Sequence, residues 1–149
     1  LRLWLTGEAV AEMSDAAGTS WLDVGRRDWD DGLLAATGLS RAQMPRLVEG
    51  SEVSGLLRDD LGARWGLPKG VVVAGGGGDN AASAVGVGVV QAGEAFVSLG
   101  TSGVLFAASD AYRPDAGSAV HTFCHALPGT WHQMGVILAA ADALNWWAR

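Results

Sequence analysis

Residues 71–90 read VVVAGGGGDNAASAVGVGVV, an apolar run followed by four glycines, an aspartate and a segment of small residues. The run at 71–74 is too short for a helix and rich in β-branched side chains, so it predicts a strand buried on both faces, as in a parallel sheet. Asn80 can cap a helix that continues to about Gln91, with Gly93 placed to end it. The segment therefore predicts a strand, a glycine loop and a helix, with Asp79 at the tip of the loop.

The loop suits a ligand that carries phosphate, because glycines let the main chain approach it and the N-terminus of a helix is positively polarised. Residues 76–81 satisfy the G-x-G-x-x-A form of the dinucleotide fingerprint, but this match is weak. A dinucleotide site also needs an acid about 20 residues further on, at the end of the next strand, whereas Glu94 precedes its strand. The Asp79 carboxylate would also repel a bound pyrophosphate, so a dinucleotide-binding module is disfavoured.

An acid at the tip of this loop makes better chemical sense if a phosphoryl group arrives there to be transferred. In-line transfer needs a base beside the attacking hydroxyl, and Asp79 is the candidate for that base. Asn80 has both a donor and an acceptor on its amide, so it can orient a polyhydroxylated acceptor. A second interpretation stays open: a tight turn with a carboxylate that compensates the helix dipole needs no catalytic role.

Residues 95–99 and 104–108 form two apolar runs joined by Gly-Thr-Ser-Gly, which predicts a β-hairpin. The hydroxyls of Thr101 and Ser102, with the N–H groups around Gly100, could hold the phosphates of a donor nucleotide. An ordinary hairpin turn has the same composition, so this alternative also stays open. The character of the chain changes near Gly93, where we place a domain boundary that divides it into residues 1–92 and 93–149.

Composition limits the partners of this chain. Of its 149 residues, 49% are hydrophobic, which is typical of a globular protein. There are 10 Lys and Arg against 16 Asp and Glu, without a basic patch, so nucleic acid is not expected as a partner. The apolar runs are too short to span a membrane. The single cysteine, Cys124, favours a cytoplasmic location, and the start at Leu1 without a basic and apolar leader predicts a piece of a longer protein that has no signal peptide.

Three histidines, His121, His125 and His132, raise the question of a metal site. Their spacing lacks the further ligands that a metal would need, and Cys124 is the only such neighbour, so we expect core or loop histidines and no metal ligands. Asp15, in the segment SDAAGT, is most simply a turn or cap residue.

Four motifs taken together resemble the FGGY carbohydrate kinase family, and in particular its members that phosphorylate xylulose. They are LTGEAVAEMSDAAGTSWLDVGRRDWD at 5–30, VVAGGGGDNAASAVGVG at 72–88, SLGTSGVLFA at 98–107 and AVHTFCHALPGTWHQMGVIL at 119–138. The resemblance implies an α/β fold of the actin-like or ribonuclease-H-like kind with two domains. Residues 1–92 would be the C-terminal part of the N-terminal, sugar-binding domain, and residues 93–149 the N-terminal part of the ATP-binding domain.

The resemblance also implies an activity, the transfer of the γ-phosphoryl group of ATP, with Mg²⁺, to the 5-hydroxyl of D-xylulose. Asp79 would be the catalytic base, Asn80 a sugar contact, and Gly100, Thr101 and Ser102 part of the phosphate-binding hairpin. The enzyme would be cytoplasmic, and a homodimer is left open. The family's Asp-x-Gly-Thr loop is absent, so we expect the 149 residues alone to be inactive and to fold poorly. Two alternatives remain, a kinase for another sugar or polyol and a non-catalytic nucleotide-binding module of the actin-like kind.

Overall fold

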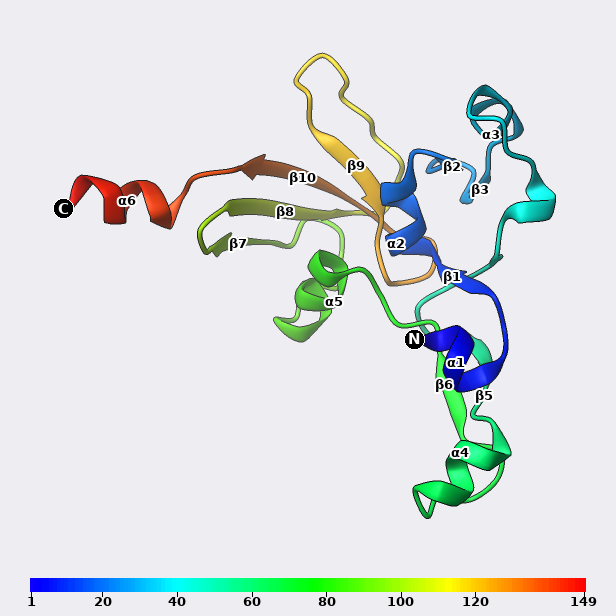
Figure 1. The fold of residues 1–149 in the computed structure, drawn as a ribbon. Coiled ribbons are helices and arrows are strands. Elements are labelled where there is room, and N and C mark those ends of the chain that lie inside the picture. Colours follow the sequence, from blue (N-terminus) through cyan, green and yellow to red (C-terminus); the bar gives the residue numbers. More distant parts are fainter.

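The computed structural model describes all 149 residues and contains helices and strands in mixed order (Figure 1). The first half consists of α1 (Arg2–Thr6), β1 (Val10–Glu12), α2 (Met13–Ala16), η1 (Ala17–Thr19), β2 (Leu22–Asp23), β3 (Asp28–Trp29), α3 (Asp31–Ala36), η2 (Arg41–Gln43), β4 (Arg46–Val48), β5 (Val53–Leu56), α4 (Asp59–Arg64) and β6 (Val72–Ala74). The second half consists of α5 (Asp79–Gly86), β7 (Ala95–Leu99), β8 (Gly103–Ser109), β9 (His121–Cys124), β10 (Trp131–Ile137) and α6 (Ala141–Trp147).

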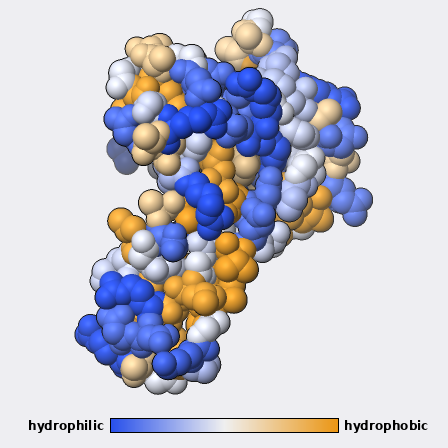
Figure 2. All heavy atoms as spheres, turned by 90° about the vertical axis from the view of Figure 1, so that its right-hand side faces the viewer, coloured by the Kyte–Doolittle hydropathy of each residue, from blue (hydrophilic) through white to orange (hydrophobic).

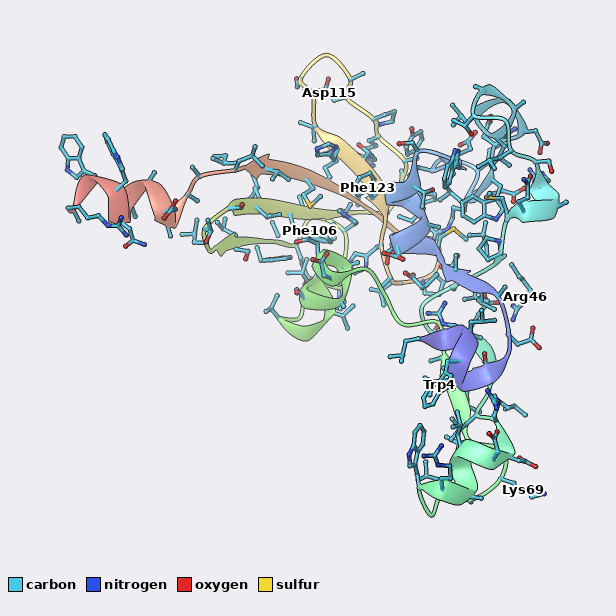
Figure 3. All side chains as sticks on the ribbon, viewed as in Figure 1. Trp4, Arg46, Lys69, Phe106, Asp115 and Phe123 are labelled. Atoms are coloured by element: carbon cyan, nitrogen blue, oxygen red, sulfur yellow. The ribbon has the colours of Figure 1, made fainter.

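The second half is built around one antiparallel sheet with the strand order β7-β8-β10-β9. The first half has only two-stranded pairs: β1 with β4, β2 with β3, and β5 with β6. In Figure 1, α5 lies beside the sheet, α2 lies near β9, and the β5, β6 and α4 segment extends away as an arm. Trp4 of α1 packs against Trp65 at the end of α4, with ring centroids 5.9 Å apart, and so joins α1 to this arm (Figure 3).

Two hydrophobic clusters hold these parts together. The larger one includes residues of α2, η1, β2, β3, α3 and β9: Met13, Ala16, Ala17, Leu22, Trp29, Leu34 and Cys124. The smaller one packs α5 and the segment after it against β8: Ala84, Val89, Phe106 and Ala108. Two sheet residues labelled in Figure 3 pack in these clusters, Phe123 against the larger one and Phe106 in the smaller one. The sheet therefore contacts both the α2 region and α5, and this brings the two halves of the chain together.

The predicted hairpin is confirmed, because β7 and β8 pair antiparallel with Leu99 opposite Gly103. The predicted helix after the glycines exists but is shorter than expected. It ends at Gly86, and Gly88, with φ of +87°, turns the chain before Gln91. Asn80 does not cap it, since Gly78 is the N-cap residue and Asn80 is already inside the first turn.

The prediction for residues 71–74 is wrong about how the strand pairs and how far it is buried. A strand is present as β6, but it pairs antiparallel with β5, and Val72 is 55% exposed. Within this chain β6 has a partner on one edge only and no layer over Val72, so the expected burial on both faces is not seen. The one parallel pair is β1 with β4.

Large apolar side chains reach the surface in several places. Orange spheres in Figure 2 gather over the middle of the molecule and on the lower arm, above a polar tip. The exposed residues include Val53, Leu56 and Val72 of the arm and Leu99 and Ile137 of the sheet. Exposed apolar surface of this kind is typical of a face that packs against another part of a protein. None of the helices has the length and apolar character needed to cross a membrane.

Candidate active site

The glycine loop between β6 and α5 lies directly against another piece of backbone. Gly75 N–H donates to the Glu52 carbonyl (2.8 Å) and Gly76 N–H donates to the Gly50 carbonyl (2.9 Å). A Cβ atom on Gly75 would collide with the carbonyl of Glu49, and Gly76 has φ of +84°. Glycine is therefore required here by the close approach of two chains and by the backbone conformation.

Two polar contacts hold the ends of this loop. The guanidinium of Arg2 donates to the carbonyls of Val10 (2.9 Å) and Gly75. At the other end, Gly78 N–H donates to Ser14 Oγ (2.9 Å). These contacts join β1 and α2 to the glycine loop, although more than 60 residues separate them in the sequence.

Ser14 is in turn held by a buried carboxylate. Its hydroxyl donates to Glu12 Oε2 (2.6 Å), and Glu12 also accepts from the backbone N–H groups of Ser14 (3.0 Å) and Asp15 (3.1 Å). Glu12 is 2% exposed and is the N-cap residue of α2. A buried carboxylate with several donors is well satisfied, so the chain from Glu12 through Ser14 to Gly78 fixes where α5 begins.

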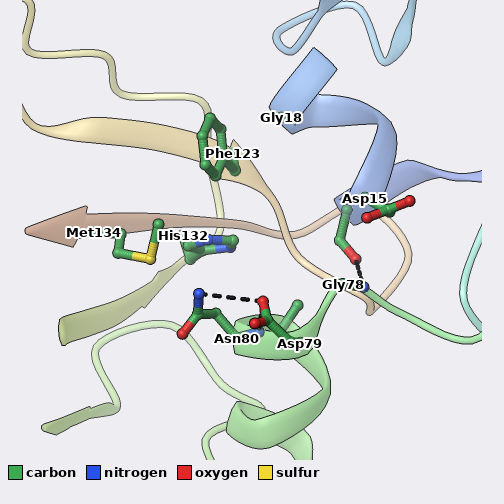
Figure 4. A pocket seen from close by; sticks show the side chains of 10 residues that line it. Asp15, Gly18, Gly78, Asp79, Asn80, Phe123, His132 and Met134 are labelled. Atoms are coloured by element: carbon green, nitrogen blue, oxygen red, sulfur yellow. Dashed lines mark hydrogen bonds between the residues drawn. The ribbon is translucent and has the colours of Figure 1, made fainter. Parts of the chain in front are cut away.

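Asp79 is the first residue of α5, and its carboxylate is exposed at the helix N-terminus. Its Oδ1 accepts from Asn80 N (2.7 Å) and from Asn80 Nδ2 (3.3 Å), as drawn in Figure 4. No hydrogen bond from the protein reaches Oδ2. The Asn80 amide thus holds one carboxylate oxygen and leaves the other free to accept a proton or a hydrogen bond from a ligand hydroxyl.

Two neighbouring cavities open beside this carboxylate. The first, of about 140 Å³, is lined by α2, the start of α5 and the sheet: Ser14, Asp15, Gly18, Gly78, Asp79, Asn80, Ala81, Phe123, His132 and Met134 (Figure 4). The second, of about 530 Å³, is lined by α1, β1 and the glycine loop: Arg2, Val10, Ala11, Glu12, Asp15, Gly75, Gly77, Gly78 and Asp79. Asp15, Gly78 and Asp79 line both, so the Asp79 carboxylate lies where the two cavities meet.

The charge of this site suits a neutral, hydroxyl-bearing ligand. Asp15 and Asp79 contribute two carboxylates to both cavities, and Arg2 is the one cation among the lining residues. A phosphate anion placed between the carboxylates would be repelled, whereas sugar hydroxyls can donate hydrogen bonds to them. No group of three or more His, Cys, Asp or Glu side chains in this structure could hold a metal ion.

The second predicted loop lies elsewhere. The turn of Gly100, Thr101 and Ser102 is exposed and contacts the segment before α6: Ser102 Oγ donates to Leu138 O (3.1 Å), and Thr101 O accepts from Ala140 N (2.7 Å). None of these three residues lines either cavity beside Asp79. The structure therefore brings Asp79 and Asn80 together but does not place the hairpin turn in the same pocket.

Comparison with known proteins identifies the family. Residues 1–86 match the model described as "FGGY family of carbohydrate kinases, N-terminal domain". The chain belongs to the FGGY family. It is 58% identical over all 149 residues to the xylulose kinases of Klebsiella pneumoniae and of Escherichia coli strain K12. It also matches a crystal structure from Brucella ovis described as a xyloylose kinase, at 67% identity and a TM-score of 0.96 over 99% of the chain.

These matches confirm the predicted FGGY sugar-kinase fold and the resemblance drawn from the four motifs. The chain spans only 31% of the length of each of the two curated relatives and 30% of the Brucella ovis chain. The exposed apolar faces of β6 and of the sheet are consistent with a much larger FGGY fold around this part.

Sequence reasoning missed three residues of the candidate site. Asp15 does lie in the first turn of α2, near its predicted role, but it also lines both cavities. Ser14 holds the glycine loop, and no local pattern indicates this contact. His132 is a buried residue, as expected, yet it lines the pocket of Asp79. The alternation of His132 and Met134 along one strand was a signal that both would lie on the same face.

Proposed function

We propose that these residues belong to a kinase that transfers the γ-phosphoryl group of ATP to the 5-hydroxyl of D-xylulose. The observation that carries this proposal is the Asp79 carboxylate, held through Asn80 with one oxygen free, beside cavities lined by polar and acidic groups. The identity to xylulose kinases across the whole chain supports xylulose as the acceptor.

In the proposed reaction, Asp79 accepts the proton of the 5-hydroxyl as its oxygen attacks the γ-phosphorus. The bond from the γ-phosphorus to the β,γ-bridging oxygen breaks, ADP leaves, and D-xylulose 5-phosphate is formed. Asn80 orients the carboxylate and offers its amide to the sugar. The fixed start of α5 keeps this geometry, and closure around the sugar excludes water as a competing acceptor.

The donor side of the site is proposed on residues 93–149, which we assign to the ATP-binding domain, with residues 1–92 in the sugar-binding domain. Gly100, Thr101 and Ser102 present N–H and hydroxyl groups in an exposed turn, which suits the phosphates of ATP. Mg²⁺ would be held mainly by those phosphates and by water, as is usual for Mg²⁺ in phosphoryl-transfer sites. Cys124 is buried and without a disulfide, as suits the proposed cytoplasmic location.

The test uses the full-length protein that carries these residues. ADP release is measured with D-xylulose, ribulose, glycerol and no acceptor, for the unchanged protein and for Asp79→Asn. We expect turnover that depends on xylulose and falls by roughly 10²- to 10⁴-fold in the variant, because the base is lost and the shape is kept. Asp59→Asn is the matched control, since Asp59 is the first residue of α4 as Asp79 is of α5, and lies on the arm.

Other outcomes would replace the proposal. Turnover with ribulose or glycerol in place of xylulose would change the acceptor. ATP binding without stimulation by any acceptor would favour a non-catalytic nucleotide-binding module. A cooperative unfolding transition and xylulose phosphorylation by the 149 residues alone would contradict our expectation that the active unit is larger.

A further inference from the structure

His132 lies at the border between the sheet and the candidate active site. It is on β10, is 2% exposed, and stacks on Phe106 with ring centroids 4.1 Å apart and an interplanar angle of 18°. It also lines the smaller cavity with Asp79 and Asn80. In Figure 4 its imidazole lies across that cavity from the Asn80 amide. The ring is thus held in place by an aromatic contact on one side and faces the pocket on another.

Neither ring nitrogen of His132 has a hydrogen-bond partner. The neighbouring buried histidine, His125, behaves differently: its Nε2 pairs with the Val89 carbonyl (3.2 Å) and its Nδ1 accepts from Leu127 N (3.3 Å). Leaving a buried polar group unpaired costs roughly 1–3 kcal/mol, so a histidine that only fills space is a poor choice here. The contrast indicates that the partner of His132 is a ligand that occupies the pocket.

The protonation state of the imidazole limits the kind of ligand that it can bind. Burial, and then the neighbouring His125, lower the pKa of His132 to about 4, while the Cys124 carbonyl opposes this weakly without reaching hydrogen-bonding geometry. The ring is therefore neutral near pH 7 and has one N–H donor and one acceptor nitrogen. The two nitrogens point to different sides of the ring, so one ligand oxygen can pair with only one of them. A hydroxyl group, which both donates and accepts, can pair with either nitrogen, whereas a phosphate anion, which accepts, can pair only with the N–H.

We infer that His132 is a specificity-determining residue that hydrogen-bonds one hydroxyl of the sugar acceptor held beside Asp79 and Asn80. The inference rests on the proposed function. It means that the acceptor is recognised from two sides, by the start of α5, within residues 1–92, and by β10, within residues 93–149. An acceptor that lacks this hydroxyl would leave the imidazole unpaired in the complex and would be rejected for that reason.

The test compares acceptors that each lack one hydroxyl. For the full-length protein, kcat/KM is measured with D-xylulose and with its 1-deoxy, 3-deoxy and 4-deoxy analogues, for the unchanged protein and for His132→Phe. Phenylalanine keeps the stacking on Phe106 and removes both nitrogens. His121→Phe is the matched control, because it makes the same substitution at an exposed histidine of β9 that lines neither cavity.

We expect His132→Phe to lower kcat/KM for D-xylulose by roughly 10- to 100-fold and to abolish the preference over one deoxy analogue only. The preference over the other two analogues, and all ratios in His121→Phe, should stay unchanged. If every ratio is the same in His132→Phe as in the unchanged protein, the histidine is only structural and the inference is wrong, whatever happens to the overall rate.

A second measurement needs no variant. In the ¹⁵N-labelled full-length protein, D-xylulose added without nucleotide should shift the imidazole nitrogen resonances of His132 and leave those of His125 unchanged; no shift at saturating sugar would overturn the inference. Failure of the proposed function is separate, because it would appear as no sugar-dependent turnover in the unchanged protein.

Discussion

The two glycine-containing loops of this chain differ in what requires their glycines. In the loop at 75–78, a Cβ on Gly75 would collide with the Glu49 carbonyl, and Gly76 has a left-handed backbone. In the hairpin turn, the nearest atom to a Cβ on Gly100 would be Ser102 O at 3.7 Å, which is ordinary van der Waals contact. The protein itself demands glycine in the first loop, whereas at Gly100 of the second loop only a ligand could demand it.

The two loops also differ in how they are held. Behind the first loop lies a buried polar network from Glu12 through Ser14 to Gly78, and His132 faces it across the pocket. The hairpin turn is exposed and its contacts run to the segment before α6. A preorganised loop suits a base that must be aimed, and an open loop suits a part of the site that a nucleotide completes.

The largest effect is expected for Gly75→Ala. The added methyl group cannot coexist with the Glu49 carbonyl, so the glycine loop and the start of α5 must move. Urea unfolding of the full-length protein should show a loss of about 3 kcal/mol or more. Gly86→Ala, in the last turn of α5 with no atom near the new Cβ, should be neutral or stabilising. Equal stability of the two variants would mean that the first loop is as open as the hairpin.

Acid should destabilise the folded protein through its two buried histidines, His125 and His132. The pKa values of His132, about 4, and of His125 are lowered from 6.5, in each case mainly by burial. As the pH falls below 6.5, the unfolded state binds these protons first, so stability is fully present above about pH 6.5 and is lost toward pH 4. For His132 the loss is on the order of 3 kcal/mol.

The free energy of unfolding, measured from pH 7.5 to 4, should fall as the pH is lowered. The fall should be smaller in His132→Phe than in the unchanged protein. An unchanged slope in the variant would show that other groups cause the loss.

The sequence predicts the local structure of this chain better than its long-range contacts. The hairpin is predictable because two apolar runs flank a glycine-bounded turn. The sequence predicts Asp79 at the tip of the glycine loop just before a helix, and in the structure it is the first residue of that helix. The exposure of Val72 was not predictable, since the covering of a strand depends on what packs over it. The polar side chain of Asn80 suggests a cap, but Gly78 occupies the N-cap position, because it is the last residue before α5 with non-helical backbone angles.

The candidate site shows the same division. Asp79 and Asn80 are adjacent in the chain and were found together. Ser14 contacts Gly78 across 64 positions, and only the folded chain brings them to 2.9 Å. The proposed roles of Gly100, Thr101 and Ser102 stay predictions.

Ser14→Ala should have a moderate effect. It removes the acceptor of the Gly78 N–H and one donor to the buried Glu12 carboxylate. We expect about 1–2 kcal/mol less stability and a kcat lower by roughly tenfold, because the start of α5 loosens, with the KM for ATP unchanged. Ser83→Ala, an exposed position of α5, is the control. A change confined to stability, with normal kcat, would show that the network supports the fold but does not aim Asp79.

The smallest effect on stability is expected for Gly100→Ala, and it is the sharpest test of the difference between the two loops. Because the added methyl group meets only ordinary contacts, the free energy of unfolding should change by less than about 0.5 kcal/mol. If the turn binds the phosphates of ATP through its backbone, the same methyl group lies where the ligand must approach, and the KM for ATP should rise by roughly tenfold while the KM for D-xylulose stays constant. If the KM for ATP is unchanged, neither the protein nor the nucleotide requires glycine at position 100, and the hairpin is an ordinary turn.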